Sequence, residues 1–190
     1  MTGIPGDPGR TAIGFTTTQE FHRVAGPAAY DLGDVFTLER WIKRNNATAA
    51  NYGIVGKGAT AYYMRLSSDN KIHLLKDGTA DISGSTATIT DTTTWHYVAC
   101  TKNGASTVTI EIDGVEGHSA PTADVCVNAG GDFLIGADAP GTSDRADLTT
   151  AHIAGYPTVL SHATLLSHYQ TGITAPTAIL PQWCRIRYNG

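Results

Sequence analysis

The clearest pattern in the chain is the alternation of apolar and polar residues over 107–112. Valine and isoleucine occupy the even positions, and threonine and glutamate occupy the odd ones, which is the period of a half-buried β-strand. Similar short segments recur at 20–24, 35–44, 52–57, 61–67, 71–76, 94–102, 106–112, 132–137 and 151–156. Many short strands without long helical periods between them predict an all-β fold, an antiparallel sandwich or barrel.

Turn-forming dipeptides separate several of these segments. Asp-Asn stands at 69–70, Asn-Gly at 103–104 and Asp-Gly at 113–114. These residues tolerate the positive φ angles that a tight hairpin turn requires. We therefore expect the chain to reverse direction at all three places.

One helix is expected late in the chain, over HATLLSHYQ (162–170). Ser161 can cap its first turn, and Gly172 can end it. The helix offers an apolar stripe made by Leu165, Leu166 and Tyr169, and we expect it to pack over one rim of the sandwich. Residues 1–172 then form one domain. Residues 173–190 contain two prolines and an aromatic, basic end, and are expected to be an extended tail that docks on a partner.

Composition and charge narrow the function classes. With 41% hydrophobic and 16% charged residues, the 190-residue chain has the composition of one soluble domain. Thirteen basic against seventeen acidic side chains give a net charge of −4 without a basic stripe, which argues against nucleic-acid binding. No apolar stretch has the length of a membrane span. The N-terminal MTGIPGDPGRTAIGF lacks a signal-peptide core, so we expect synthesis in a cytoplasm without export by the usual route.

The spacing of the cysteines and histidines does not indicate a disulfide framework or a metal site. Cys100, Cys126 and Cys184 are too scattered for a disulfide framework, and we expect three free thiols, with Cys100 in the core. The seven histidines form no helical i,i+4 pair and no His-x-His pair. We therefore expect them to have structural roles.

The segment TVTIEIDGVEG (107–117) contains the spacing Glu-x-Asp-x-x-Glu, formed by Glu111, Asp113 and Glu116. This spacing resembles the motif of retaining endoglucanases of the laminarinase type, in which the three acids serve as nucleophile, helper and acid. Such enzymes need two carboxyl groups roughly 5–5.5 Å apart on one face, and a β-bulge in a continuous strand supplies that geometry. Asp113-Gly114 instead predicts a hairpin, with Glu116 on the neighbouring strand and the three acids exposed to solvent around the turn. We expect no enzyme.

The order of several segments identifies a family resemblance. DVFTLERWIKR, YGIVGKG, AYYMRLSSDNKIHLL, TWHYVACTKNG, VTIEIDGVEG, FLIGAD and YPTVLSHATLLSHYQTG follow one another, as in laminin-G-like, concanavalin A-like modules. The resemblance covers about residues 10–172. It implies a two-sheet antiparallel jelly-roll sandwich in which the Asp-Gly is a hairpin tip, and it implies binding without catalysis.

The closing segment is similar to modules in virion proteins of phages that infect actinobacteria. The resemblance implies a tail-associated or head-decorating protein on the phage particle, with other virion proteins, copies of itself and bacterial surface glycans as partners. A free-standing glycan-binding adhesin is the alternative, and a laminarinase-like hydrolase using Glu111 and Glu116 is a third hypothesis.

Calcium is doubtful because the acidic pair of related modules is absent. Ala151 and His152 stand where those acids are expected. Asp138, Asp144 and Asp147 lie in a polar loop that could hold a hard cation, but such loops are more often solvated turns. No cofactor is expected otherwise.

Aromatic residues are the remaining candidates for binding. Tyr52, Tyr62 and Tyr63 cluster in adjacent segments, and a sugar can stack on an exposed ring. Because Tyr62 and Tyr63 alternate, we expect one in the core and one exposed. In the tail, a protein contact is expected from the residues typical of interface hot spots: Trp183, Arg185, Arg187 and Tyr188.

Overall fold

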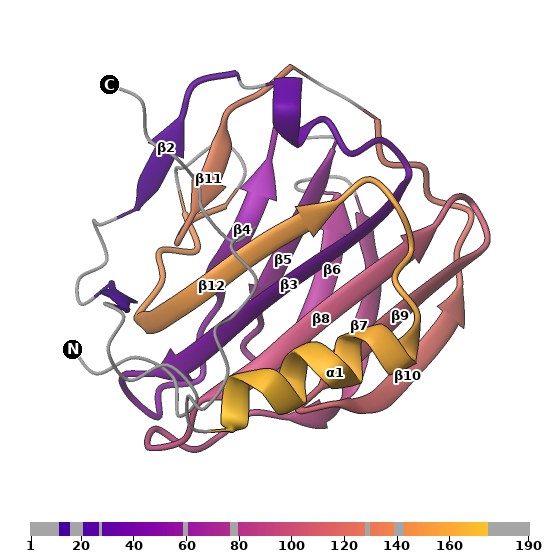
Figure 1. Ribbon diagram of the computed structural model, residues 1–190. Coiled ribbons are helices and arrows are strands. Elements are labelled where there is room, and N and C mark those ends of the chain that lie inside the picture. The colour runs from indigo at the N-terminus through magenta and orange to yellow at the C-terminus, as the bar shows by residue number, and fades with distance from the viewer. Residues whose placement is uncertain are drawn as a thin grey trace.

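Two antiparallel sheets of six strands each form a sandwich in this computed structural model (Figure 1). The structure describes residues 12–15, 21–26, 28–58, 61–76, 80–127, 130–138 and 143–174. The all-β, two-sheet antiparallel fold with one late helix is confirmed. The predicted tail lies outside the described residues except for its first two residues.

The first sheet contains both strands of the hairpin at 113–114. Its strand order is β1 (Ile13–Gly14), β12 (Leu148–Tyr156), β3 (Val35–Arg44), β8 (His96–Asn103), β9 (Thr107–Ile112) and β10 (Val115–Pro121). The second sheet has the order β2 (His22–Val24), β11 (Phe133–Ile135), β4 (Tyr52–Lys57), β5 (Tyr62–Leu66), β6 (Lys71–Lys76) and β7 (Ala80–Thr88). A 3-10 turn, η1 (Ala28–Tyr30), and the helix α1 (His162–Ile173) complete the described elements.

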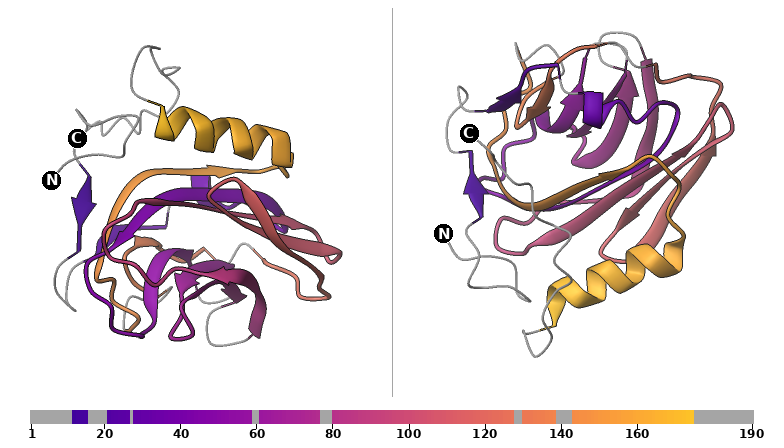
Figure 2. Two further views of the ribbon diagram at one scale, coloured as in Figure 1. Left: turned by 90° about the horizontal axis from the view of Figure 1, so that it is seen from below. Right: turned by 45° about the horizontal axis from the view of Figure 1, so that its top comes forward.

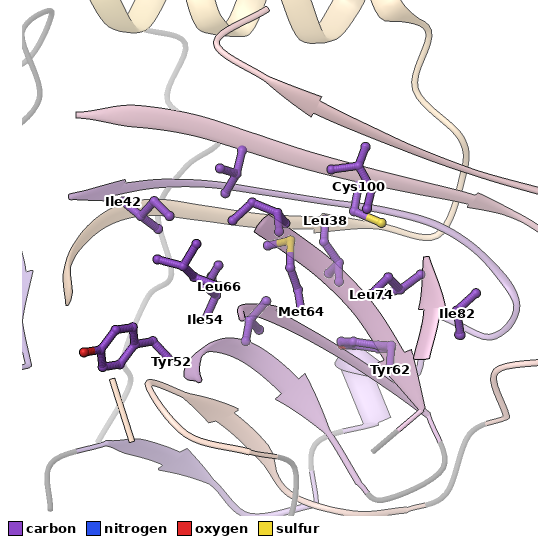
Figure 3. Close-up of a cluster of buried hydrophobic side chains, with 14 of the residues drawn as sticks. Leu38, Ile42, Tyr52, Ile54, Tyr62, Met64, Leu66, Leu74, Ile82 and Cys100 are labelled. Carbon is purple, nitrogen blue, oxygen red and sulfur yellow. The ribbon is translucent and has the colours of Figure 1, made fainter. Parts of the chain in front are cut away.

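The main hydrophobic core fills the space between the sheets (Figure 3). The even positions of β9 lie in it, as the alternation predicts, and Met64 and Leu66 enter it from β5. All of these side chains except Ile112 are completely buried, and Ile112 is nearly so. Burying one such side chain contributes about 1.5–3 kcal/mol, so this inner face fixes the register of both sheets.

The three predicted chain reversals are confirmed. Asn70 has φ 64° between β5 and β6, and Gly104 has φ 59° between β8 and β9. Asp113 and Gly114 have φ 55° and 72°, and the residues that flank them, Ile112 and Val115, pair directly. Two consecutive positive φ angles are the geometry of a type I′ hairpin turn, which matches the twist of the two strands.

The helix α1 covers the outer face of the first sheet (Figure 2). Ser161 caps it as predicted, accepting a hydrogen bond from the Thr164 N–H. The predicted location over a rim is wrong, because Leu165 packs against Trp41 and Tyr97 in the middle of the sheet face. Gly172 does not end the helix either. It lies in the last turn against the Trp41 ring, and an added Cβ would be 2.3 Å from Trp41 Cζ2.

Two buried arginines crosslink the sandwich. The Arg40 guanidinium lies between the sheets, where Nη1 donates to the Ile54 carbonyl at 3.0 Å, and burial lowers its pKa to about 9. Arg44 donates to the Ile89 carbonyl at 2.7 Å and to Asn70 Oδ1 at 2.6 Å. These bonds join β4, Asn70 and Ile89 to β3, one of the two central strands of the first sheet.

Two of the three cysteines lie within the described residues. Cys100 and Cys126 are buried free thiols, as predicted, and Cys100 is part of the core. Burial raises the pKa of Cys126 to about 11 and that of Cys100 further, so neither thiol is a nucleophile at neutral pH. Within the described part of the chain, no helix has both the length and the apolar character needed to cross a membrane.

Candidate functional site

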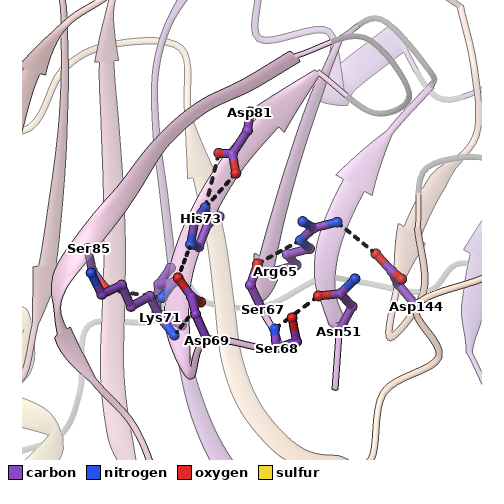
Figure 4. Close-up of polar contacts among 11 residues, drawn as sticks. Asn51, Arg65, Ser67, Ser68, Asp69, Lys71, His73, Asp81, Ser85 and Asp144 are labelled. Atoms are coloured by element: carbon purple, nitrogen blue, oxygen red, sulfur yellow. Dashed lines mark hydrogen bonds and ion pairs between the residues drawn. The ribbon is translucent and has the colours of Figure 1, made fainter. Parts of the chain in front are cut away.

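The outer face of the second sheet carries a set of charged and polar side chains. Arg65 lies on this face because Met64 and Leu66 on either side of it enter the core, and side chains alternate along a strand. His73 pairs directly with Arg65 in the neighbouring strand β6. The set, here named the outer polar face, consists of Asn51, Arg65, Asp69, His73, Asp81 and Asp144 (Figure 4).

His73 is held between two carboxylates. Its Nδ1 lies 2.8 Å from Asp81 Oδ2, and its Nε2 lies 3.1 Å from Asp69 Oδ2. The ring lies over Gly84 in β7, where an added Cβ would be 2.8 Å from His73 Cε1. The two aspartate side chains remain about half exposed, at 47% and 48%. They therefore present carboxylate oxygens to solvent in fixed positions.

Burial raises the pKa of Asp69, but hydrogen bonds from the Lys71 N–H and from His73 outweigh it, so that the pKa is lowered overall. Asp69 is therefore an anion at neutral pH. A carboxylate in this state accepts hydrogen bonds from several hydroxyl donors at once.

Arg65 is oriented by partners on both sides. Its Nε donates to Ser67 Oγ at 2.7 Å, and its Nη1 lies 3.2 Å from Asp144 Oδ2. Asn51 Oδ1 accepts from the Ser68 N–H at 3.0 Å at the same end of the sheet. The face thus combines planar donors and acceptors that are already positioned, which is the arrangement that polar ligand sites use.

The three predicted tyrosines are buried. Tyr52, Tyr62 and Tyr63 are 6%, 1% and 0% exposed, which argues against a role in stacking on a sugar. Tyr62 donates its hydroxyl to the Tyr30 carbonyl, and Tyr63 donates to Asp144 Oδ2. Tyr63 therefore supports the outer polar face by holding Asp144. The expectation that one of the two alternating rings is exposed is wrong.

The three predicted cation ligands are engaged with different partners. Asp138 is buried and accepts from the Ser143 N–H and hydroxyl, both at 2.8 Å. Asp144 faces Arg65, and Asp147 accepts from the Asn46 side chain. Among the described residues, these aspartates do not form a group with the spacing of metal ligands. The predicted interface residues Trp183, Arg185, Arg187 and Tyr188 lie outside the described residues.

The carboxylates of the Glu-x-Asp-x-x-Glu motif lie on the opposite side of the molecule. Glu111 and Glu116 are cross-strand partners in the β9–β10 hairpin. Glu111 is only 2% exposed, and His162 Nδ1 lies 3.0 Å from its Oε2. The expectation of three solvent-facing acids is therefore wrong for Glu111. Burial raises the pKa of this carboxyl group, His162 lowers it in part, and Glu116 raises it further.

A second carboxylate is buried beside α1. Glu39 accepts from the hydroxyls of Tyr97 and Tyr156 and contacts His168 Nδ1 at 2.9 Å. Three partners for one carboxylate offset its desolvation. Together with the packing of Leu165 against Trp41 and Tyr97, they hold the helix on the first sheet.

Sequence reasoning missed the outer polar face. Its members come from three separate segments, around 51, 65–81 and 144, and the register of β5, β6 and β7 brings Arg65, His73 and Asp81 together. The signal that could have found them is the charged odd positions of β5 and β6, where Arg65 and His73 alternate with core residues.

Comparison with known structures identifies the same sandwich in other proteins. A putative carbohydrate binding protein from Bacteroides ovatus superposes with a TM-score of 0.61 at 16% identity, over 81% of this chain and 47% of that one. The binding domain of Botulinum neurotoxin DC in complex with SialylT gives 0.58 at 13% identity, over 80% and 39%. Trypanosoma rangeli sialidase gives 0.53 at 16% identity, over 71% and 22%. The chain spans less than half the length of each.

Comparison by sequence gives the family. No curated protein matches the chain. A laminin G family model, described as the concanavalin A-like lectin/glucanases superfamily, matches residues 19–165, which include all twelve strands except β1. The chain therefore belongs to the concanavalin A-like lectin/glucanase superfamily.

Proposed function

We propose that the chain is a non-enzymatic carbohydrate-binding module and that the outer polar face is its binding surface. The observation that carries this proposal is that Arg65 and His73 are paired in fixed positions with partly exposed carboxylates. The opposite face of the same sheet packs in the hydrophobic core. Sugar hydroxyls are both donors and acceptors, and they bind to planar carboxylate, amide and guanidinium groups through several simultaneous hydrogen bonds.

Two similarities support this ligand class. The Bacteroides ovatus protein is described as a putative carbohydrate binding protein, and the neurotoxin domain was solved in complex with SialylT. Identities of 13–16% show only that the fold is shared. The proposed ligand class therefore rests on the side chains of the outer polar face. Neutral and amino sugars suit this face best, because its carboxylates outnumber its arginine.

The absence of glycosidase activity is part of the proposal. A glycosidase requires both carboxyl groups to reach a sugar from solvent. Glu111 is buried under the first turn of α1, where His162 is its partner, so a glycosidic bond has no path to it. Incubation with β-glucans, with Glu111→Gln as the comparison, is expected to give no turnover by either protein. Turnover lost in the variant would contradict this.

The finer proposal is that the module acts on a phage particle. It rests on the order of sequence segments similar to those of actinobacteriophage virion proteins, closing with YPTVLSHATLLSHYQTG. The module would be displayed on a tail or head, with other virion proteins and copies of itself as neighbours, and would contact a bacterial surface glycan. Gold-labelled antibody against the purified chain is expected to decorate particles from an actinobacterial lysate. Unlabelled particles in which mass spectrometry also finds no chain would contradict it.

A glycan array tests the binding proposal. Wild-type protein is expected to bind a subset of bacterial wall glycans, and Arg65→Ala and Asp81→Asn are each expected to lose most of that signal. Lys43→Ala is the matched control, because it removes a cation that lies over Trp95 on the other sheet, and it is expected to bind normally. Equal binding by all four proteins would overturn the assignment of the face.

A further inference from the structure

Three side chains with metal-ligating atoms converge at the base of α1, away from the outer polar face. They are Glu111 of β9, Glu116 of β10 and His162, the first residue of the helix. Their ligand atoms all lie within 4.8 Å of one another. Among the described residues, this is the only group of three such side chains. Its members come from three different elements, so the fold itself assembles it.

The group is unbalanced in charge without a cation. Glu111 and Glu116 are directly opposite on adjacent strands, where like charges repel. Glu111 is also almost completely buried, so water does little to screen that repulsion. One imidazole nitrogen, His162 Nδ1, lies 3.0 Å from Glu111 Oε2. An imidazole carries a positive charge only when it is protonated, so this ring offsets at most one of the two carboxylates.

We propose that Glu111, Glu116 and His162 bind a divalent transition-metal ion of the zinc class. The donor set decides the class, since one imidazole nitrogen with two carboxylate oxygens suits Zn²⁺. Ca²⁺ and Mg²⁺ prefer oxygen ligands alone. A zinc ion binds its ligand atoms at about 2.0–2.2 Å. Separations of up to 4.8 Å between the ligand atoms are slightly too wide for all three to reach one ion at that distance. Glu116 and the His162 side chain, which is 43% exposed, are free to close that difference by rotation, while Glu111 stays fixed.

The ion has a structural consequence in this position. It joins the β9–β10 hairpin to the first turn of α1, at the opposite end of the helix from Gly172. Three protein ligands leave a coordination position for water or a ligand from solution. The proposal is independent of carbohydrate binding, because the outer polar face belongs to the other sheet.

The test is binding of zinc alone to the full chain after treatment with EDTA. Calorimetric titration with ZnCl₂ is expected to show saturable binding of one ion per chain, with a higher unfolding temperature at saturation, whereas MgCl₂ and CaCl₂ leave the temperature unchanged. Replacing a residue that only hydrogen-bonds to a metal ligand weakens metal binding about 10- to 100-fold, and loss of a ligand itself is expected to cost at least as much. We therefore expect Glu116→Gln and His162→Ala to weaken zinc binding at least about tenfold.

The control is His73→Ala, which removes a histidine that lies between two carboxylates on the outer polar face, far from the proposed ligands. It is expected to bind zinc as the wild type does. Glu116 and His162 are exposed, so both variants are expected to fold, and circular dichroism checks this. Absence of saturable zinc binding to the wild type would overturn the proposal. Unchanged affinity in both folded variants, or loss of affinity in the control alone, would overturn it equally.

Discussion

Glu111 and Glu116 lie directly opposite each other across the β9–β10 hairpin. In one continuous strand, two residues five positions apart would point to opposite faces. The reversal at Asp113-Gly114 brings them to the same face, which α1 then covers through His162. The same backbone turn therefore buries one carboxylate of the motif and creates a three-ligand group from residues that a continuous strand would separate.

The turn gives a first prediction. Gly114→Ala is expected to destabilise the protein by more than Gly33→Ala, although both glycines have φ near +71°. The left-handed conformation alone costs about 1–2 kcal/mol for alanine. At Gly114 the added Cβ would also lie 2.7 Å from Tyr169 Cδ1, whereas a Cβ added at Gly33 would have open space within 4 Å. Urea unfolding measures both, and equal losses would contradict the contact between the turn and α1.

At the last turn of α1, a glycine-to-alanine substitution is expected to change the stability in the direction opposite to the usual one. Replacing glycine by alanine inside a helix normally stabilises it by about 0.5–1 kcal/mol. Gly172→Ala is expected to destabilise the protein by about 1–3 kcal/mol instead, because the Cβ would overlap the Trp41 ring. Ser167→Ala, at an exposed position of the same helix, serves as the control and is expected to change stability little. A stabilised Gly172→Ala protein would show that the helix does not pack on Trp41.

Glu39 and Glu116 differ in their partners, and their substitution by glutamine separates the two roles. Glu39→Gln leaves Tyr97, Tyr156 and His168 facing an amide that cannot accept from all three, and is expected to cost about 1–3 kcal/mol. Glu116→Gln relieves a like-charge pair and is expected to be neutral or slightly stabilising in EDTA. Equilibrium unfolding of both variants in EDTA checks this. The reverse order of stability would contradict the proposed hydrogen bonding of Glu39.

A pH dependence follows from His96, which lies between Asp91 and Asp113. Burial lowers the pKa of His96, but hydrogen bonds to Asp113 and Asp91 outweigh it and raise the pKa overall. The folded state then holds the proton more tightly than the unfolded one. Its contribution to stability is full below pH ~6.5 and is lost as the pH rises through the folded pKa.

Asp91 acts in the opposite direction. Burial raises its pKa, but hydrogen bonds from His96 and from the N–H groups of Thr94 and Thr93 lower it overall. Its contribution is therefore present above pH ~3.8 and is lost as the pH falls. Urea unfolding from pH 4 to 9 is expected to show a decline above neutrality that His96→Gln removes. An unchanged pH profile in that variant would contradict the role of His96.

Much of the sandwich can be predicted from local pattern. The three turns could be predicted because Asn-Gly, Asp-Gly and Asp-Asn favour positive φ, and the inner face of β9 follows from its alternation. The strand β7 (Ala80–Thr88) could not, because ADISGSTAT has one large apolar residue, Ile82, and no alternation. It forms the edge of the second sheet, where pairing with β6 determines the strand more than its own propensity does.

The sites depended on contacts that are distant in sequence. Tyr63 is buried because the segment containing Asp144 lies against β4 and β5, where the Gly53 N–H donates to the Asp144 carbonyl. The alternation of side chains along β5 cannot predict that this distant segment covers Tyr63. Likewise, Glu111 and His162 are 51 positions apart, and only the docking of α1 on the first sheet joins them.

Mapping of amide chemical shifts tests the central claim most directly. Labelled protein would be titrated with a wall glycan that binds on the array. The account predicts saturable shifts centred on Arg65, His73 and Asp81, with little change at Glu111 or along α1. Shifts centred on Glu111 and His162, accompanied by cleavage of the glycan, would contradict a non-catalytic module that binds through its second sheet.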